Sequence, residues 1–262
     1  MRKMTRLSTA LASLIMLGLM AGCAQNPPSD PWDPLEPVNR FNYEFTQKAD
    51  KYVMKPVAKG YKKALPDRVR TSVGNFFDNA AQPVTMINSL LQLKWGKFNQ
   101  SLGRFMLNTT VGLGGLFDVA SALDVPHPEE DFGQTFGYWG LGPGMYLYIP
   151  ILGPSDGRDF IGGIADQFAN PLDYLNYFDE IRYNVRWLPY VLRVIEGINV
   201  RANLLGYEDT LKQQFDPYAF LRSYYLEKRL KAVYDNNVPD ELLYSDDSLN
   251  EDDYPPPQSD DQ

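Results

Sequence analysis

The sequence predicts a mainly helical domain with little or no β-strand. Apolar side chains recur at helical spacing along most of the central part of the chain, and a pattern typical of a strand occurs only at residues 146–151. Helix-start signals accompany this spacing, including Pro56 and the pair Asp216–Pro217. We find no internal repeat, and the roughly 200 residues between the two atypical ends are enough for one domain.

The first predicted helix, residues 38–55, is amphipathic. Its aromatic residues Phe41, Phe45 and Tyr52 fall on one face, and three lysines fall on another. These lysines are Lys48, Lys51 and Lys55. Such a helix suits a membrane interface, with the aromatic rings toward the acyl chains. The alternative is a solvated lysine face on a soluble domain.

Further helices follow from the same spacing. Pro56 is expected to begin the second helix, and Asp216 to cap the last one, residues 218–234. The remaining predicted helices span residues 69–77, 83–93, 97–108, 160–168 and 183–203.

The first 22 residues have the layout of a secretory signal peptide. A basic start precedes an apolar run, residues 7–20, that is too short to span a bilayer. The segment ends in LMAGC, which resembles the lipobox of bacterial lipoproteins, although Met20 departs from the usual Leu. We therefore expect Cys23, the single cysteine, to carry acyl and diacylglycerol chains, with no other cofactor. The alternative is a non-lipidated export signal. If Cys23 is lipidated, Ala24 after it favours sorting to the outer membrane over retention in the inner one.

The two ends of the body differ in character. A Pro-rich tether, residues 23–32, precedes the body at 33–234, and residues 235–262 contain ten acidic residues and no basic one. Such a composition predicts a disordered acidic tail. The chain has 25 Lys and Arg and 33 Asp and Glu, so removing the three basic residues of the signal and the ten acidic residues of the tail leaves 22 and 23. This near-neutral body shows no sign of nucleic-acid binding.

The residues needed for common enzyme chemistry are missing. His127 is the only histidine, no G-x-S-x-G elbow is present, and we expect His127 to be a solvated loop residue. One histidine and a lipidated cysteine cannot supply a metal site built on those ligands. The glycines of residues 112–115 are not followed by G-K-[ST], so they form no phosphate loop. We expect neither catalytic residues nor a metal.

Four segments resemble the VacJ/MlaA family of outer-membrane phospholipid-trafficking lipoproteins. They are DPLEPVNRFNYEF at 33–45, RFMLNTTVGLGGLFDVA at 104–120, FGQTFGYWGLGPGMYLYIPILGPSDGRD at 132–159 and DPYAFLRSYYLEKR at 216–229. The resemblance implies a single ring-like helical body, partly embedded at the periplasmic face of the outer membrane and associated with a trimeric porin. It also implies that mislocalised phospholipid passes from the outer leaflet through an amphipathic channel to a periplasmic lipid carrier, which maintains lipid asymmetry. The alternative is a structural lipoprotein that braces a porin or envelope complex without moving lipid.

Glycines mark the candidate channel wall. Gly112, Gly114 and Gly115 lie in one uncharged stretch, and Gly140 and Gly142 in another. Uncharged, glycine-rich walls would suit the channel, and glycine also permits a hinge. We expect the polar loop 125–131 and the strand-like segment after it to form a flap beside the lipid path that pivots near Gly140 and Gly142. The alternative is that these glycines only make tight turns.

Overall fold

The computed structural model describes residues 33–178, 187–208, 211 and 213–243. The expected signal peptide, the tether and Cys23 lie outside the described residues, as do residues 183–186 of the expected helix 183–203 and most of the acidic tail.

The described residues are mainly helical, as the sequence predicts, with two short strands. The longer helices are α2 (Glu36–Ala49), α3 (Lys55–Ala64), α4 (Asp67–Leu91), α5 (Trp95–Thr110), α8 (Gly157–Ala169), α9 (Leu188–Asn203) and α11 (Pro217–Val233). The shorter helices are α6 (Val119–Ala122), α7 (Phe132–Tyr138) and α12 (Asp240–Leu243), with 3-10 helices at Pro171–Phe178 and Leu204–Gly206.

Helices α2 and α3 form one almost continuous rod. A π-helical turn, Asp50–Met54, joins them where the sequence suggested a break at Pro56. Pro56 lies in the first turn of α3 and has no N–H to donate, and its ring would crowd the carbonyl of Tyr52 in a regular α-helix. The wider π turn just before Pro56 relieves that crowding, so the rod continues.

Helix α4 corrects the prediction of two separate helices at 69–77 and 83–93. It runs unbroken from Asp67 to Leu91 with Pro83 inside it. Pro83 removes one hydrogen bond of the helix, but α4 packs along α5, α7, α8 and α9 on either side of this position. Packing along its whole length therefore outweighs the local cost of the proline.

The two strands form a hairpin. The predicted strand is confirmed as β1 (Tyr146–Ile149), and it pairs antiparallel with β2 (Gly153–Asp156). Tyr146 lies opposite Asp156, and the turn between the strands has positive φ at Ile151 and Gly153. The second strand, GPSD, was not predicted because Gly, Pro and Asp are depleted in strands.

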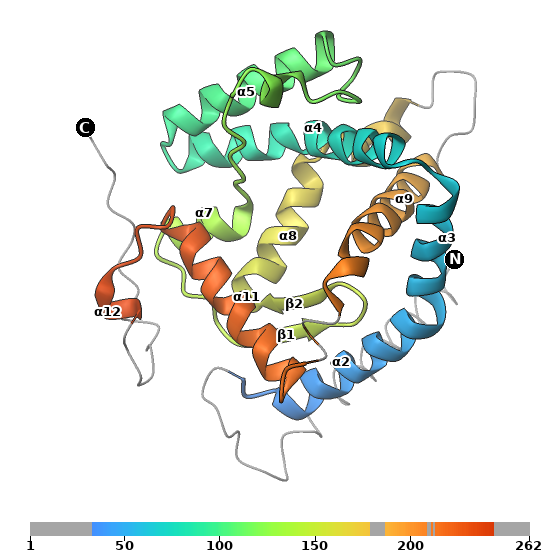
Figure 1. Cartoon of the computed structure of the whole chain (residues 1–262). Coiled ribbons are helices and arrows are strands. Elements are labelled where there is room, and N and C mark those ends of the chain that lie inside the picture. Colours follow the sequence, from blue (N-terminus) through green and yellow to red (C-terminus); the bar gives the residue numbers. More distant parts are fainter. Residues whose placement is uncertain (1–32, 179–186, 209–210, 212, 244–262) are drawn as a thin grey trace, which may run out of the picture.

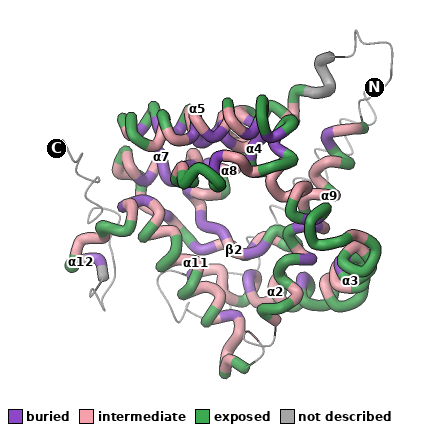
Figure 2. Tube along the Cα trace, turned by 45° about the horizontal axis from the view of Figure 1, so that its top comes forward, coloured by how far each residue is buried: buried purple, intermediate pink, exposed green. Residues whose placement is uncertain are grey.

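The helices follow a ring-like path. In Figure 1, α2, α3 and α4 follow one another around the outline, α11 returns to lie near α2, and α8 and α9 cross the middle. Helix α3 packs against α9, α8 against α7, and α11 against α7 and β2. Figure 2 shows that the buried residues are scattered along these elements. The largest buried cluster is aromatic: Tyr146, Tyr148 and Tyr218 pack with Tyr43 and Tyr225.

The folded body extends beyond the expected boundary at Tyr234. Residues 240–243 form α12, and Leu242 is buried against Val233 and Tyr234. Asp235 also pairs with Lys94. The composition of 235–262 hid this packing, because a few scattered apolar residues among ten acidic ones give no periodic signal.

Candidate functional site

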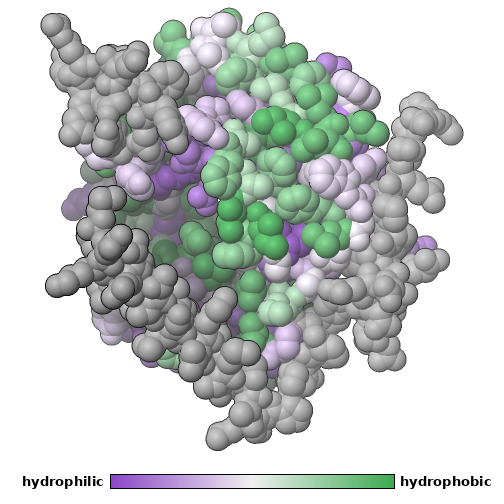
Figure 3. All heavy atoms as spheres, turned by 180° about the vertical axis from the view of Figure 1, so that it is seen from behind, coloured by the Kyte–Doolittle hydropathy of each residue, from purple (hydrophilic) through white to green (hydrophobic). Residues whose placement is uncertain are grey.

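The distribution of side chains is the reverse of that in a typical soluble domain. Among the described residues, 21 polar or charged residues are buried, against 11 hydrophobic ones, and 37 large hydrophobic side chains are exposed. A soluble monomer rarely exposes apolar side chains on this scale. Figure 3 shows many of them gathered as a hydrophobic band on the face behind Figure 1, beside a hollow. The body therefore has a largely polar interior and a broad apolar band on its exterior.

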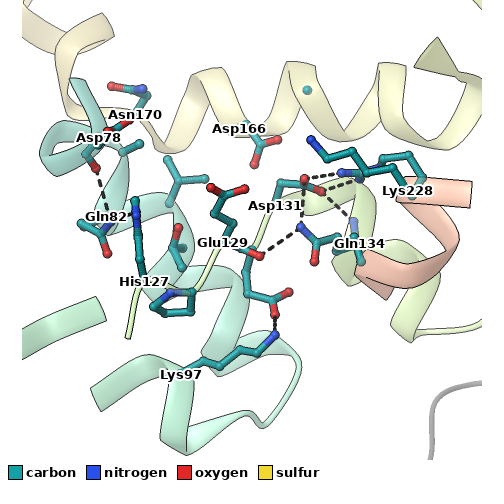
Figure 4. Close-up of a pocket in the computed structure, with 18 of the residues that line it drawn as sticks. Asp78, Gln82, Lys97, His127, Glu129, Asp131, Gln134, Asp166, Asn170 and Lys228 are labelled. Carbon is teal, nitrogen blue, oxygen red and sulfur yellow. Dashed lines mark hydrogen bonds and ion pairs between the residues drawn. The ribbon is translucent and has the colours of Figure 1, made fainter. Parts of the chain in front are cut away.

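A polar cavity of about 780 Å³ lies inside the ring. Its wall comes from α4, Lys97 on α5, the loop before α7, α7, α8, α9 and α11, so most of the ring contributes to it. Figure 4 shows Asp78, Gln82 and His127 on one side and Asp131, Gln134 and Lys228 on the other. This wall is densely charged, unlike the uncharged, glycine-rich wall that we expected.

Part of the charge in the wall is matched by ion pairs. Arg229 on α11 makes two hydrogen bonds to Asp131, at 2.7 and 2.8 Å. Burial raises the pKa of Asp131, but the hydrogen bonds and charge of Arg229 outweigh burial and hold the pKa at about 2. Glu130 is buried and pairs with Lys94 and Lys97. These pairs join the loop before α7 to α5 and α11.

Other carboxylates in the wall have no ion pair within the described part of the chain. They are Asp78 on α4, Glu129 in the loop and Asp166 on α8. Burial raises the pKa of Asp166 to about 7, although the backbone N–H of Phe132 donates to it at 3.0 Å and partly opposes that rise. Burial also raises the pKa of Asp78. The cavity thus holds carboxylates that resist ionisation.

The ends of the ring are joined by buried polar contacts. Asn39 on α2 donates to Asp33 at 2.7 Å and to the carbonyl of Tyr146 at 3.0 Å, and it accepts from the N–H of Tyr148 at 2.8 Å. The hydroxyl of Tyr218 on α11 donates to Asp33. Asp33, three residues before the start of α2, is therefore bound directly to the last long helix.

An ion pair strengthens the same junction. Arg40 makes two hydrogen bonds to Asp216, at 3.2 and 2.7 Å, and Arg222 lies 3.3 Å from Asp33. The hydrogen bond from Arg40 lowers the pKa of Asp216. Asp216 also caps α11 by accepting from the N–H groups of Tyr218 and Ala219, as predicted. We call this set the closing clamp: Asp33, Asn39, Arg40, Asp216, Tyr218 and Arg222.

The segment 104–120 contains a second buried network. Arg104 on α5 donates to Asp118 at 2.8 Å and to the carbonyl of Val125 at 2.7 Å. Asn108 donates to Asp118 and accepts from the N–H of Ala120. These contacts fold the chain back after α5. The polar residues of this segment and of the closing clamp thus hold the body together, and they do not face the cavity.

The aromatic residues predicted for the interface are exposed. Phe41, Phe45 and Tyr52 are 69%, 48% and 72% exposed. Lys48 and Lys51 are exposed, whereas Lys55 is half-buried and pairs with Glu208. An apolar face and a basic face on the α2–α3 rod agree with the predicted amphipathic helix, while its position in a membrane stays a prediction.

The five predicted glycines lie outside the wall of the cavity. Gly112 and Gly115 are closely packed, since an added Cβ would lie 2.2 Å from the carbonyl oxygen of Phe117 and 2.5 Å from the Cβ of Asn79, respectively. Gly114 and Gly140 have positive φ, and Gly140 ends α7 through N–H bonds from Gly140 to Gly137 and from Leu141 to Phe136. Gly142 follows that turn.

The predicted flap contains an unpredicted helix. Helix α7 lies between the loop 125–131 and β1, and Asp131 caps it by accepting from the N–H of Gln134. The loop is tied down at Glu130 by Lys94 and Lys97. His127 is exposed in this loop, as expected, with its Nε2 3.2 Å from Gln82. Pivoting at Gly140 and Gly142 stays a prediction.

Apart from the loop 125–131, which supplies His127 to Asp131, sequence reasoning missed the residues of the cavity. They come from positions 78 to 236, on six separate segments, with no shared motif. The one available signal for the residues on α4 was the polar residues inside the uncharged stretch at 79–93, such as Gln82 and Thr85, which interrupt an otherwise apolar helix. Within the described residues, none of the helices combines the length and the apolar character needed to cross a membrane.

Comparison with known proteins gives consistent matches. The sequence model of the MlaA lipoprotein family matches residues 31–232. The chain is 34% identical over 225 residues to the intermembrane phospholipid transport system lipoprotein MlaA of Escherichia coli (strain K12), covering 82% of this chain and 86% of that protein. It is 30% identical over 254 residues to the protein of that name from Haemophilus influenzae, covering 90% and 97%.

Two further matches extend the comparison. An uncharacterized protein of Rickettsia bellii is 36% identical over 204 residues, which is 77% of each chain. A solved structure superposes with a TM-score of 0.68 and 32% identity, covering 77% of this chain and 98% of that chain. That structure comes from work on the structural basis for maintenance of bacterial outer membrane lipid asymmetry.

Proposed function

This chain belongs to the MlaA lipoprotein family, and we propose that it removes mislocalised phospholipid from the outer leaflet of the outer membrane. In this proposal the lipid passes through the polar cavity to a periplasmic lipid carrier, which maintains lipid asymmetry. One observation carries the proposal: a charged cavity lies inside a ring whose outer surface is apolar. We assign the protein no catalytic activity.

The two chemistries of a phospholipid match this arrangement. Moving a charged headgroup through hydrocarbon without partners costs several kcal/mol or more. A polar lumen would lower that cost, because paired and unpaired charges of the wall can replace the water around the headgroup. The acyl chains would stay on the apolar side of the ring. The headgroup would therefore move through the polar lumen while the acyl chains stay in contact with the hydrocarbon of the membrane.

The proposed placement is at the periplasmic face of the outer membrane. Acyl chains on Cys23 would anchor the chain, and the α2–α3 rod would lie flat with Phe41 and Phe45 toward the acyl chains. The exposed aromatic side chains of this rod support the proposal. We also propose that a trimeric porin is a partner, since its outer wall offers an apolar surface at the same depth.

Blocking the cavity tests the proposal. Gly163 on α8 lines the cavity, and a Cβ built there meets nothing within 4 Å. The side chain of Gly163→Trp should therefore extend into the lumen from an unobstructed Cβ, without loss of helix propensity. Gly103 on α5 is equally half-buried and equally open, but it lies outside the wall of the cavity, so Gly103→Trp is the matched control.

Each variant would replace the normal copy in cells, with phospholipid at the cell surface as the measurement. We expect surface phospholipid to accumulate with Gly163→Trp as it does when the protein is depleted, and to stay normal with Gly103→Trp. If depletion causes accumulation and a folded Gly163→Trp protein prevents it, the cavity conducts no lipid. The protein would then act as a structural lipoprotein that braces a porin or envelope complex.

A further inference from the structure

Three carboxylates that line the polar cavity have no ion pair among the described residues. Asp78, Glu129 and Asp166 lack an ion pair within the described residues, and Asp78 is near enough to Glu129 for their charges to interact. Figure 4 shows Glu129 between Gln82 and Asp131, with Asp166 nearby. We call Asp78, Gln82, Glu129 and Asp166 the acceptor wall. A positively charged group bound here would favour the ionised form of these carboxylates and pair with them.

Gln82 provides independent evidence for a donor ligand at this wall. It is only 3% exposed, and its Oε1 has no hydrogen-bond partner among the described residues. Its Nε2 donates to the carbonyl of Asp78 at 3.3 Å, which fixes the amide so that Oε1 is the free atom. A buried acceptor left without a donor costs about 1–3 kcal/mol. The Oε1 atom of Gln82 could therefore accept a hydrogen bond from an N–H or O–H group of a ligand.

Among the described cations that line the cavity, Lys228 is the one without an ion pair. Lys228 on α11 lines the cavity, is exposed, and has no ion pair among the described residues, whereas neighbouring Arg229 is held by Asp131 and Asp159. Figure 4 shows Lys228 across the cavity from Asp78 and Gln82. The cavity thus presents an acidic, acceptor-rich side and a basic side, and it is large enough for a small zwitterion between them.

We propose that the acceptor wall receives the ammonium group of a zwitterionic headgroup that carries N–H donors, such as phosphoethanolamine, while Lys228 takes the phosphate. This inference rests on the proposed function and adds selectivity to it. A primary ammonium satisfies both needs of the wall, since it carries positive charge for the carboxylates and a donor for Gln82. Phosphocholine supplies the charge without N–H, and phosphoglycerol supplies no cation.

The test compares lipids that differ only in the headgroup. The full-length acylated protein is mixed with detergent micelles that contain equal amounts of phosphatidylethanolamine, phosphatidylcholine and phosphatidylglycerol with the same acyl chains. Lipid that remains on the captured protein is quantified by mass spectrometry. Lipid that is lost in Gly163→Trp but kept in Gly103→Trp is the lipid of the cavity.

We expect the lipid of the cavity to be enriched about tenfold in phosphatidylethanolamine over phosphatidylglycerol, with phosphatidylcholine between them. Glu129→Gln should bring this ratio down several-fold, and because Glu129 is exposed and unpaired the variant should fold. Glu44→Gln, an exposed acid on α2, is the control and should keep the ratio of the wild type.

Two different results would overturn the inference. If cavity lipid has the composition of the micelles, or if Glu129→Gln keeps the full enrichment, the acceptor wall does not select the headgroup, and lipid conduction still stands. If Gly163→Trp and Gly103→Trp hold the same lipid as the wild type, no lipid occupies the cavity. The proposed function then fails together with the inference.

Discussion

Arg229 on α11 and Asp131 at the start of α7 form two parallel hydrogen bonds across 98 residues of chain. The same guanidinium reaches Asp159 on α8 at 2.8 Å, and Tyr225 donates to Asp159 at 2.6 Å. One side chain therefore holds three helices around the polar cavity. Arg229 is largely buried, and its removal would leave Asp131 without a matching charge, whereas Asp159 would keep its ion pair with Arg158.

The first prediction follows from this arrangement. Arg229→Gln should lower the free energy of unfolding by about 3–5 kcal/mol at neutral pH, as expected when one partner of a buried pair is removed. Lys231→Gln on the same helix removes only an exposed pair with Glu227 and should cost less than about 1 kcal/mol. Urea unfolding followed by tryptophan fluorescence measures both. If both variants lose the same small amount of unfolding free energy, Arg229 does not hold the three helices together.

The pKa of Asp166 predicts a dependence of stability on pH. Its value in the folded protein is about 7, above the value of about 3.9 in an unfolded chain. Between these values the folded state binds more protons than the unfolded state, so stability falls as pH rises from 4 to 7. The fall should be on the order of 2 kcal/mol, since water in the cavity screens part of the effect.

Asp166→Asn should flatten that part of the profile. Asn keeps an oxygen that can accept from the N–H of Phe132 and cannot ionise. The free energy of unfolding between pH 4 and 8, measured for both proteins, gives the comparison. A variant with the same slope as the wild type would assign the slope to other groups, foremost Asp156, whose pKa burial raises to about 6.

Lipidation of Cys23 is tested by removing its thiol. Cys23→Ser should leave the protein without fatty-acid label and in the soluble periplasmic fraction, because no other cysteine is present. Labelling with palmitate and fractionation of the envelope provide the measurement. Normal labelling of the variant would contradict the prediction.

The depth of the α2–α3 rod is tested by placing a charge on each side of α2. Phe45→Asp should loosen the body from the bilayer, since the charge would meet hydrocarbon, whereas Gln47→Asp, on an exposed polar position of α2, should have little effect. A spin label at position 41 reports the contact. If the label is fully accessible to an aqueous quencher already in the wild type, the rod is solvated.

The hinge at Gly140 and Gly142 makes a separate prediction. Gly140 has a φ of 89°, so Gly140→Ala should cost about 1–2 kcal/mol of stability for its turn alone. We further expect the folded double alanine variant to change surface phospholipid, because stiffer residues would hinder the movement of α7 and the hairpin. Gly103→Ala is the control for a glycine within a helix. Unchanged lipid in the folded double variant would rule out the hinge.

Local signals explain what was predicted correctly. Asp216–Pro217 is a complete helix start in two residues, and β1 follows from an apolar run with aromatic residues. Pro83 misled for the opposite reason, because its effect on α4 depends on contacts far away in sequence. Helix α7, with the sequence FGQTFGY, was missed because two glycines in seven residues suggest a turn. The cavity was beyond reach, since its wall exists only after six segments meet.

The closing clamp also bears on the order in which the protein can fold. The hydrogen bond between Asp33 and Tyr218 spans 185 residues. Contacts of such separation form late, because the entropy of closing a long loop must be overcome first. A nascent chain therefore has its polar interior open and its apolar faces uncovered until α11 has been synthesised and exported. A chain that ends before Asp216 has most of its helices but lacks the part of the closing clamp that lies at the start of α11. The ring around the polar cavity therefore closes only when synthesis is almost complete.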